Sequence, residues 1–109
     1  MAKIRAGEFN KLMQRVAEAW SAGNAVIAAS YYTESALFEF CGGQRPEPPL
    51  QMIWHHLAFD EREQIGFGKY LFQQIVFGDR SLQIKNRYHG IVWVRVDNGK
   101  ISNWREFRV

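Results

Sequence analysis

Glu106, a carboxylate near the end of the chain, is the residue best placed to do acid–base chemistry. It lies in the run Trp104-Arg105-Glu106-Phe107, which has the character of a β-strand. Because side chains alternate along a strand, Trp104 and Glu106 share one face, and Arg105 and Phe107 share the other. A carboxylate beside an indole in a partly apolar hollow has its charged form disfavoured, which suits acid–base work. The alternative is a surface carboxylate in a cross-strand ion pair.

The histidines are candidates for a metal site or a general base, because imidazole titrates near neutral pH. His55 and His56 are adjacent, and His89 is isolated in sequence. Adjacent histidines point in different directions on a helix or a strand, and no further His or Cys cluster lies at ligand spacing. We therefore expect no metal and no other cofactor, with His55 as a catalytic candidate and His56 as a pocket residue. The alternative for both histidines is a structural role.

Two tyrosines and a second carboxylate complete the polar candidates. Tyr70 and Tyr88 fall on expected strands that can face a hollow, where a tyrosine hydroxyl can polarise a carbonyl. We take Tyr70 as a catalytic candidate and Tyr88 as a pocket residue; the alternative is core packing with the hydroxyl at the rim. Glu39 alternates with Phe38 and Phe40, so it faces either into the pocket as a second acid or out to solvent.

The remaining candidates are aromatic. Trp54, Phe72 and Trp104 are expected to line the pocket or to fill the core. Trp93 and Arg95 share one face of a strand whose other face carries valines at 92, 94 and 96. We expect the valines to pack on helices, which leaves Trp93 and Arg95 on the outer face. Trp and Arg are favoured at interfaces, so a homodimer is predicted there.

Composition limits the class of protein. The chain has 109 residues, the size of one domain, and we expect a single domain over residues 1–109. Hydrophobic residues make up 47% and charged residues 23%, as in globular proteins. The net charge is +3, but charges of both signs are spread along the chain, which argues against nucleic-acid binding. The single cysteine, Cys41, and the absence of a long apolar stretch predict a cytoplasmic protein without a membrane span.

Helices are expected in the first third of the chain. The first is indicated by apolar residues at i, i+3, i+4, i+7 and i+11: Phe9, Leu12, Met13, Val16 and Trp20. Gly23 is a natural end for it, and Asn24 suits the N-cap of a second helix that runs to about residue 32. Residues 50–57 fit a helical face better than a strand, so a short third helix is predicted there.

Strands are expected elsewhere. Residues 36–40, 66–77, 82–96 and 101–109 have strand character, and residues 59–64 form a short strand or a loop. Gly66 and Gly68 mark a bulge or a close backbone approach. The tetrapeptide Asp97-Asn98-Gly99-Lys100 favours a type I′ hairpin turn. Helices followed by strands predict an α+β fold in which the helices pack on one face of a curved antiparallel sheet.

The ending at residues 94–107 resembles the closing hairpin of SnoaL-like proteins in the nuclear-transport-factor-two-like superfamily. Those proteins commonly have an apolar strand, an acidic-x-Gly-Lys-Ile turn and then Trp-Arg-Glu-aromatic. The first two helices also match, and the run WHHLAFD at residues 54–60, followed by GxGxYxF from residue 66, is similar to uncharacterised members. The resemblance implies a cone-shaped α+β barrel, with the N-terminal helices in the concavity of the sheet.

The same resemblance implies a set of functions rather than one. The fold hosts isomerases, cyclases, hydrolases and non-catalytic dimerisation modules, so fold alone does not assign chemistry. Glu106 falls where limonene epoxide hydrolase relatives carry an acidic residue that faces the cavity. Those relatives also need an Arg and an Asp, which the run Lys69-Tyr70-Leu71 lacks, so epoxide hydrolysis is not expected. We expect a domain that binds a small apolar or semi-polar molecule, with acid–base catalysis through Glu106 as one hypothesis. The alternative is a non-catalytic interaction module.

Overall fold

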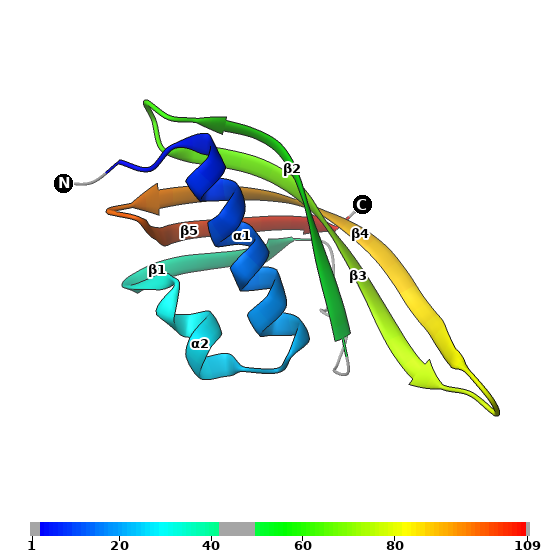
Figure 1. Ribbon diagram of the computed structural model, residues 1–109. Helices are drawn as coiled ribbons and strands as arrows, with labels where there is room; N and C mark the ends of the chain where they lie inside the picture. The colour runs from blue at the N-terminus through cyan, green and yellow to red at the C-terminus, as the bar shows by residue number, and fades with distance from the viewer. Residues whose placement is uncertain (1–2, 42–49, 109) are drawn as a thin grey trace.

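Two helices lie against one face of a curved five-stranded sheet (Figure 1). The computed structural model describes residues 3–41 and 50–108, except for the side chains of residues 50, 75–77, 84–86, 88 and 108. The elements are α1 (Ala6–Ser21), α2 (Ala25–Ser30), β1 (Tyr32–Cys41), β2 (Leu50–Asp60), β3 (Ile65–Phe77), β4 (Leu82–Asp97) and β5 (Lys100–Arg108). Among these helices, none is long and apolar enough to cross a bilayer.

The two helices follow the sequence pattern closely. α1 buries the predicted apolar face, in which Phe9, Met13 and Val16 have no exposed surface. The chain then turns at Gly23, whose φ of 70° is one that glycine adopts without strain. Asn24 caps α2 as predicted, because its side-chain oxygen accepts a hydrogen bond from the Ile27 N–H at 3.1 Å. α2 ends earlier than expected, at Ser30, and β1 begins at Tyr32, where the second helix was expected to end and four residues before the expected strand.

The sheet has the strand order β1-β5-β4-β3-β2. Its neighbours are antiparallel except for β1 and β5, which run parallel. The predicted α+β fold class, with helices in the concavity of a curved sheet, is therefore confirmed. The sheet is mixed rather than wholly antiparallel, because the first strand pairs with the last one.

The predicted third helix is wrong, since residues 50–57 belong to strand β2. β2 pairs antiparallel with β3 along its whole length, from Leu50 opposite Gln74 to Asp60 opposite Ile65. Met52 and Trp54 are buried on the inner face with the period of a strand. The pairing of β2 with β3 shifts register between His56 and Ala58. Leu57, at this shift, is 56% exposed.

The β4–β5 turn has the geometry that the sequence predicts. Asn98 and Gly99 have φ values of 53° and 81°, and the flanking Asp97 and Lys100 are directly paired. Positive φ at both central residues is the mark of a type I′ turn. This tight turn aligns β4 with β5, and so sets which side chains of β5 face inward.

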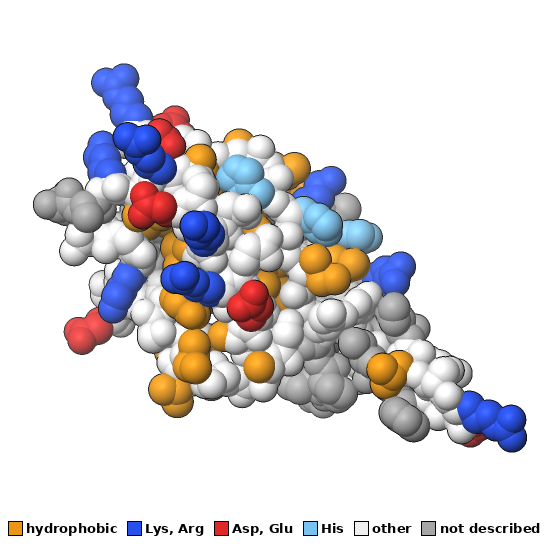
Figure 2. All heavy atoms as spheres, in the orientation of Figure 1, with side chains coloured by type: hydrophobic (Ala, Val, Ile, Leu, Met, Phe, Trp, Pro, Cys, Tyr) orange, Lys and Arg blue, Asp and Glu red, His pale blue; other side chains and the backbone are white. Residues whose placement is uncertain are grey.

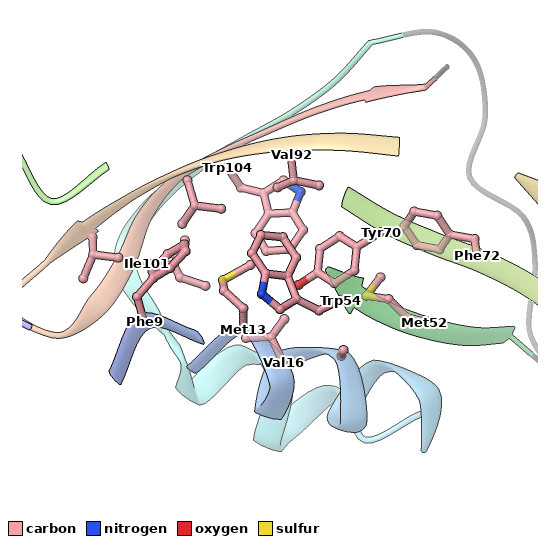
Figure 3. Close-up of a cluster of buried hydrophobic side chains, with 13 residues drawn as sticks. Phe9, Met13, Val16, Met52, Trp54, Tyr70, Phe72, Val92, Ile101 and Trp104 are labelled. Atoms are coloured by element: carbon pink, nitrogen blue, oxygen red, sulfur yellow. The ribbon is translucent and has the colours of Figure 1, made fainter. Parts of the chain in front are cut away.

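The core lies between α1 and the inner face of the sheet (Figure 3). The predicted valine face of β4 is buried there, at residues 92, 94 and 96. Gly68 is a site of close approach, because a Cβ atom on it would lie 1.9 Å from the Trp54 ring. Gly66 meets the ring of Phe9 in the same way, at 2.2 Å. The two glycines therefore let the outer edges of two large aromatic rings approach the sheet backbone closely.

The β3–β4 hairpin projects beyond the rest of the sheet (Figure 1). The described pairing of β2 with β3 ends at Gln74, whereas β3 and β4 continue to pair as far as Phe77 and Leu82. The described molecule is correspondingly elongated, with extents of 52 × 27 × 24 Å.

Candidate functional site

Glu106 lies on the inner face of β5 and is 1% exposed. Its neighbours in the sheet are Val92 on β4 and Phe40 on β1. One carboxylate oxygen, Oε1, accepts a hydrogen bond from Trp104 Nε1 at 3.1 Å. The two side chains therefore share a face, as the strand alternation predicted. A buried carboxylate is costly unless hydrogen bonds hold it, and the indole N–H supplies one such bond.

The ring of Trp104 connects Glu106 to a cluster of aromatic side chains. Tyr70 stacks on Trp104 with ring centroids 5.3 Å apart and planes at 17°. Phe38 stacks on Trp104 at 6.0 Å and 14°. Tyr70 also contacts Trp54 at 5.0 Å and Phe72 at 5.8 Å. Figure 3 shows the rings of Trp54, Tyr70 and Trp104 grouped between the sheet and α1. Four of the aromatic residues that the sequence analysis singled out thus come together beside Glu106.

Two predicted site residues lie on the other face of the sheet, which corrects their expected placement. Glu39 is on the outer face of β1, where its Oε2 lies 3.5 Å from Arg105 Nε and both side chains are about half exposed. His55 is exposed on β2, opposite Lys69 and on the face away from buried Trp54. Strand alternation explains both placements, because a neighbour of an inward residue must point outward. Neither residue can reach Glu106 through the sheet.

Three other residues considered in the sequence analysis lie at the rim of the core, at the end of a strand or outside the described side chains. His56 is on the inner face, where its ring contacts Phe9 at 5.9 Å, but it is exposed at the rim of the layer. Tyr88 lies on β4 opposite Phe72, and its side chain is outside the described part of the structure. Cys41 is exposed at the end of β1. Within the described residues, no group of three or more His, Cys, Asp or Glu side chains could hold a metal ion.

An apolar hollow between the two helices and β1 escaped the sequence analysis. Its volume is about 370 Å³. Its walls come from the end of α1, the helix connection, α2 and the start of β1: Ala19, Trp20, Gly23, Asn24, Ala25, Ala28, Ala29 and Tyr32. The alanines leave space opposite the rings of Trp20 and Tyr32. The concentration of alanines in the α2 segment is the sequence feature that could have indicated this hollow. We name this space the apolar hollow.

Tyr32 joins the apolar hollow to the buried carboxylate. It lines the hollow, and its ring lies 6.0 Å from that of Trp104. Trp104 in turn donates its hydrogen bond to Glu106. Glu106 itself does not line the hollow. A continuous series of aromatic groups therefore leads from the surface to the carboxylate.

The outer face of the sheet carries exposed apolar side chains. Phe67, Ile91 and Phe107 are 42%, 38% and 43% exposed. Ile91 and Phe107 are direct neighbours across β4 and β5, and Phe67 lies opposite Trp93. Trp93 is half-buried beneath Arg105, whose guanidinium carbon is 5.5 Å from the ring centroid. We name the set Phe67, Ile91, Trp93 and Phe107 the outer patch.

The chain matches known proteins in structure but not in sequence. No protein-family profile and no curated protein matches it. The epoxide hydrolase/cyclase-like enzyme SalBIII, which acts in pyran ring formation in salinomycin, has a TM-score of 0.72 and 12% identity over 94% of this chain and 92% of that one. A candidate SnoaL-like polyketide cyclase from Jannaschia sp. CCS1 has a TM-score of 0.69 and 10% identity, over 99% and 89% of the two chains. A candidate ketosteroid isomerase from Kribbella flavida has a TM-score of 0.68 and 15% identity, over 94% and 78%. At these identities the likeness establishes the fold.

Proposed function

We propose that this chain, whose fold is that of SnoaL-like members of the nuclear-transport-factor-two-like superfamily, binds a small apolar or semi-polar molecule and uses Glu106 as an acid–base residue. The observation that carries the proposal is the burial of Glu106 among aromatic rings, with one oxygen fixed by Trp104. A carboxylate that is buried and oriented in this way is typical of a functional site. The solved structures named above include a hydrolase/cyclase-like enzyme, a candidate cyclase and a candidate isomerase, whose chemistry agrees with this role.

The apolar hollow is the proposed entry point for the ligand. Its volume falls within the range of about 300–1,000 Å³ that is usual for small-molecule sites. Its lining is largely apolar; the Asn24 side chain is occupied in capping α2, and Trp20 and Tyr32 contribute an indole N–H and a hydroxyl. A ligand in this hollow meets Tyr32, and the path from Tyr32 to Glu106 passes along Trp104. Because Glu106 is 1% exposed and does not line the hollow, reaction at the carboxylate requires these packed rings to move aside when the ligand binds.

Filling the apolar hollow should weaken ligand binding. Ala29 lines the hollow and is exposed, so Ala29→Leu places three additional carbon atoms in that space. We expect the affinity for steroid-like or terpene-like ligands to fall about tenfold, which corresponds to ~1.4 kcal/mol. Titrations followed by tryptophan fluorescence would measure this, since Trp20 lies in the wall of the hollow.

The matched control is Val26→Leu, which enlarges an 82% exposed side chain on the same helix that does not line the hollow. It should leave the affinity unchanged. Equal binding by the parent and Ala29→Leu would show that the ligand lies elsewhere. If none of the steroid-like or terpene-like ligands binds the parent protein, a non-catalytic interaction module becomes the better explanation of what this domain does.

A second proposal concerns the oligomeric state: the outer patch binds a second copy of the chain. Clustered apolar side chains on an exposed sheet face are typical of an interface, and Trp93 with the nearby Arg95 and Arg105 supplies residue types favoured there. In a two-fold dimer the same patch lies on both sides of the interface. Glu39 at the edge of the patch is then available to pair with cations of the other copy. Lys69, directly opposite Ile91, and the two arginines make Glu39 the acidic group on this face that can meet a cation of the other copy.

A charge at the centre of the outer patch should dissociate this dimer. Ile91→Arg would place two like charges near the symmetry axis, and we expect the dissociation constant to rise about 100-fold, or ~3 kcal/mol. Sedimentation velocity over a concentration series measures it. Leu82→Arg is the control, because Leu82 is 66% exposed at the tip of the β3–β4 hairpin. A parent chain that stays monomeric at about 100 μM, well above the concentrations at which specific dimers assemble, rules this interface out.

A further inference from the structure

A second hollow lies nearer the N-terminal end of α1, and it combines positive charge with an apolar floor. Its volume is about 400 Å³, and it is bounded by the N-terminal segment, α1, the end of α2 and the β4–β5 turn. The floor includes Ile4, Leu12 and Tyr31, and the walls carry Lys11, Arg15 and Lys100. We name it the cationic hollow. Figure 2 shows blue Lys and Arg side chains around orange apolar atoms on the α1 side of the molecule.

The charges of the cationic hollow are unbalanced. Glu8 is the one acidic side chain in its lining, and its Oε1 accepts a hydrogen bond from the Arg5 N–H at the start of α1, 3.3 Å away. Within the described residues, no carboxylate forms an ion pair with Lys11, Arg15 or Lys100. The net charge of the lining is therefore +2, from three cations and one anion.

The three cations of the hollow come from two separate elements. Lys11 and Arg15 are four residues apart on α1, a spacing that brings their side chains together on one helix face. Like charges at this spacing repel, although Glu8 and Glu18, each three residues from one of these cations, offset part of the repulsion. Lys100 adds a third positive charge from the far wall of the hollow. A bound anion would relieve the repulsion among all three.

The floor of the hollow is held in place from two sides. The Ile4 N–H donates to Gln64 Oε1 at 3.0 Å, and the Gln64 amide donates back to the Ile4 carbonyl at the same distance. The Tyr31 carbonyl accepts from the Ile101 N–H at 2.9 Å. These bonds tie the N-terminal segment and the end of α2 to the sheet. A ligand would thus meet a preformed apolar surface, which reduces the entropy that binding costs.

We propose that the cationic hollow binds a single small organic anion with an apolar body, such as a carboxylate, sulfonate or phosphate ester carried on a ring or a short chain. The apolar body lies on the floor beside Leu12 and Tyr31, and the anionic group lies between Arg15 and Lys100. This site is separate from the apolar hollow and from Glu106. It adds a second ligand to the protein and does not depend on the function proposed above.

A matched pair of fluorescent probes tests the charge requirement. The probe 8-anilinonaphthalene-1-sulfonate has an apolar ring system and an anionic group, and N-phenyl-1-naphthylamine has the same rings without the charge. In Arg15→Gln/Lys100→Gln we expect the dissociation constant of the sulfonate to rise at least about fivefold, from the loss of two exposed charge contacts. The affinity for the neutral probe should change by less than about twofold, because the rings keep their apolar contacts.

The control is Lys69→Gln/Arg80→Gln, which removes the same total charge from the outer face of β3 and from the β3–β4 turn. It should leave the affinity for the sulfonate nearly unchanged. If both double variants lose the same affinity for the sulfonate, the net charge of the protein explains the loss. The proposed site would then be overturned. Sulfonate binding that is the same in all three proteins would overturn it as well.

A second measurement uses only the parent protein, so it does not depend on the folding of any variant. In a titration with the sulfonate followed by amide NMR, we expect the largest shifts at Gly99, Lys100 and Lys11. Shifts confined to Ala28 and Ala29 would place the probe in the apolar hollow and contradict the proposal. Because the two hollows are reported by different amides, failure of this site is distinguishable from failure of the ligand site near Glu106.

Discussion

Glu106→Gln should lower the rate of proton transfer to and from a bound ligand by about 10²–10⁴-fold, the usual contribution of a positioned general acid or base. Glutamine has nearly the shape of glutamate, and its side-chain oxygen can still accept the hydrogen bond from Trp104 Nε1. It cannot take up or release a proton at neutral pH. The substitution therefore removes the chemistry while it preserves the packing of a side chain that is 1% exposed.

Proton transfer can be measured without knowledge of the natural product. Ketones and 1,3-dicarbonyl compounds that bind the protein would be incubated in D₂O, and NMR would follow the incorporation of deuterium next to the carbonyl. Glu39→Gln is the matched control, because it makes the same chemical change to a half-exposed carboxylate on the outer face. Exchange that is equally fast in the parent and in Glu106→Gln would exclude Glu106 as the acid–base residue.

The parts of the fold that the sequence predicted correctly are those encoded by local patterns. The Asn98-Gly99 pair predicts a turn because two consecutive residues need positive φ, and both have it. The alternation at the end of the chain placed Trp104 and Glu106 on one face, where they form a hydrogen bond. The helical spacing of the apolar residues likewise predicted the buried face of α1 correctly. In each case the physical constraint acts over a few neighbouring residues.

The misplaced third helix shows where local patterns fail. Residues 50–57 are apolar on both faces of a strand, and Ile53, Trp54 and Leu57 also fit one face of a helix. Pairing with β3 decides between the two, because β2 makes a full antiparallel ladder and buries Met52 and Trp54 against α1. Such tertiary contacts override local preference. The parallel pairing of β1 with β5 is a long-range contact of the same kind.

The candidate site was predictable in its carboxylate and its rings but not in its cavity. Strand period placed Trp104 and Glu106 on one face, and the strands expected around Tyr70 and Phe72 could face the same hollow, whereas Trp54 was expected on a helix. The faces of Glu39 and His55 depended on the start of each strand and its register, which the sequence did not fix for β1 and β2. The apolar hollow depends on how α2 lies against β1, and alanines leave no strong signal of the space that they fail to fill.

Trp104→Ala should lower the free energy of unfolding by about 3–5 kcal/mol, the usual cost of removing a fully buried aromatic side chain. Trp104 has no exposed surface and contacts the rings of Tyr32, Phe38 and Tyr70. The truncation leaves a cavity among these rings and removes the donor to Glu106. The carboxylate would then be buried without that partner, which adds to the cost. Urea denaturation followed by circular dichroism measures the change.

Trp104→Phe separates the two contributions, because phenylalanine keeps a ring in the stack and lacks the indole N–H. We expect an intermediate loss of about 1–3 kcal/mol, which includes the loss of the indole hydrogen bond to a buried carboxylate. In the double variant Trp104→Phe/Glu106→Gln the loss should be smaller, since no buried charge is left to satisfy. Leu82→Ala, at a side chain that is 66% exposed, should cost less than about 0.5 kcal/mol. Purely additive effects of Trp104→Phe and Glu106→Gln would mean that the indole N–H stabilises the protein equally through a carboxylate and through an amide oxygen, so the carboxylate would add nothing specific to this pair.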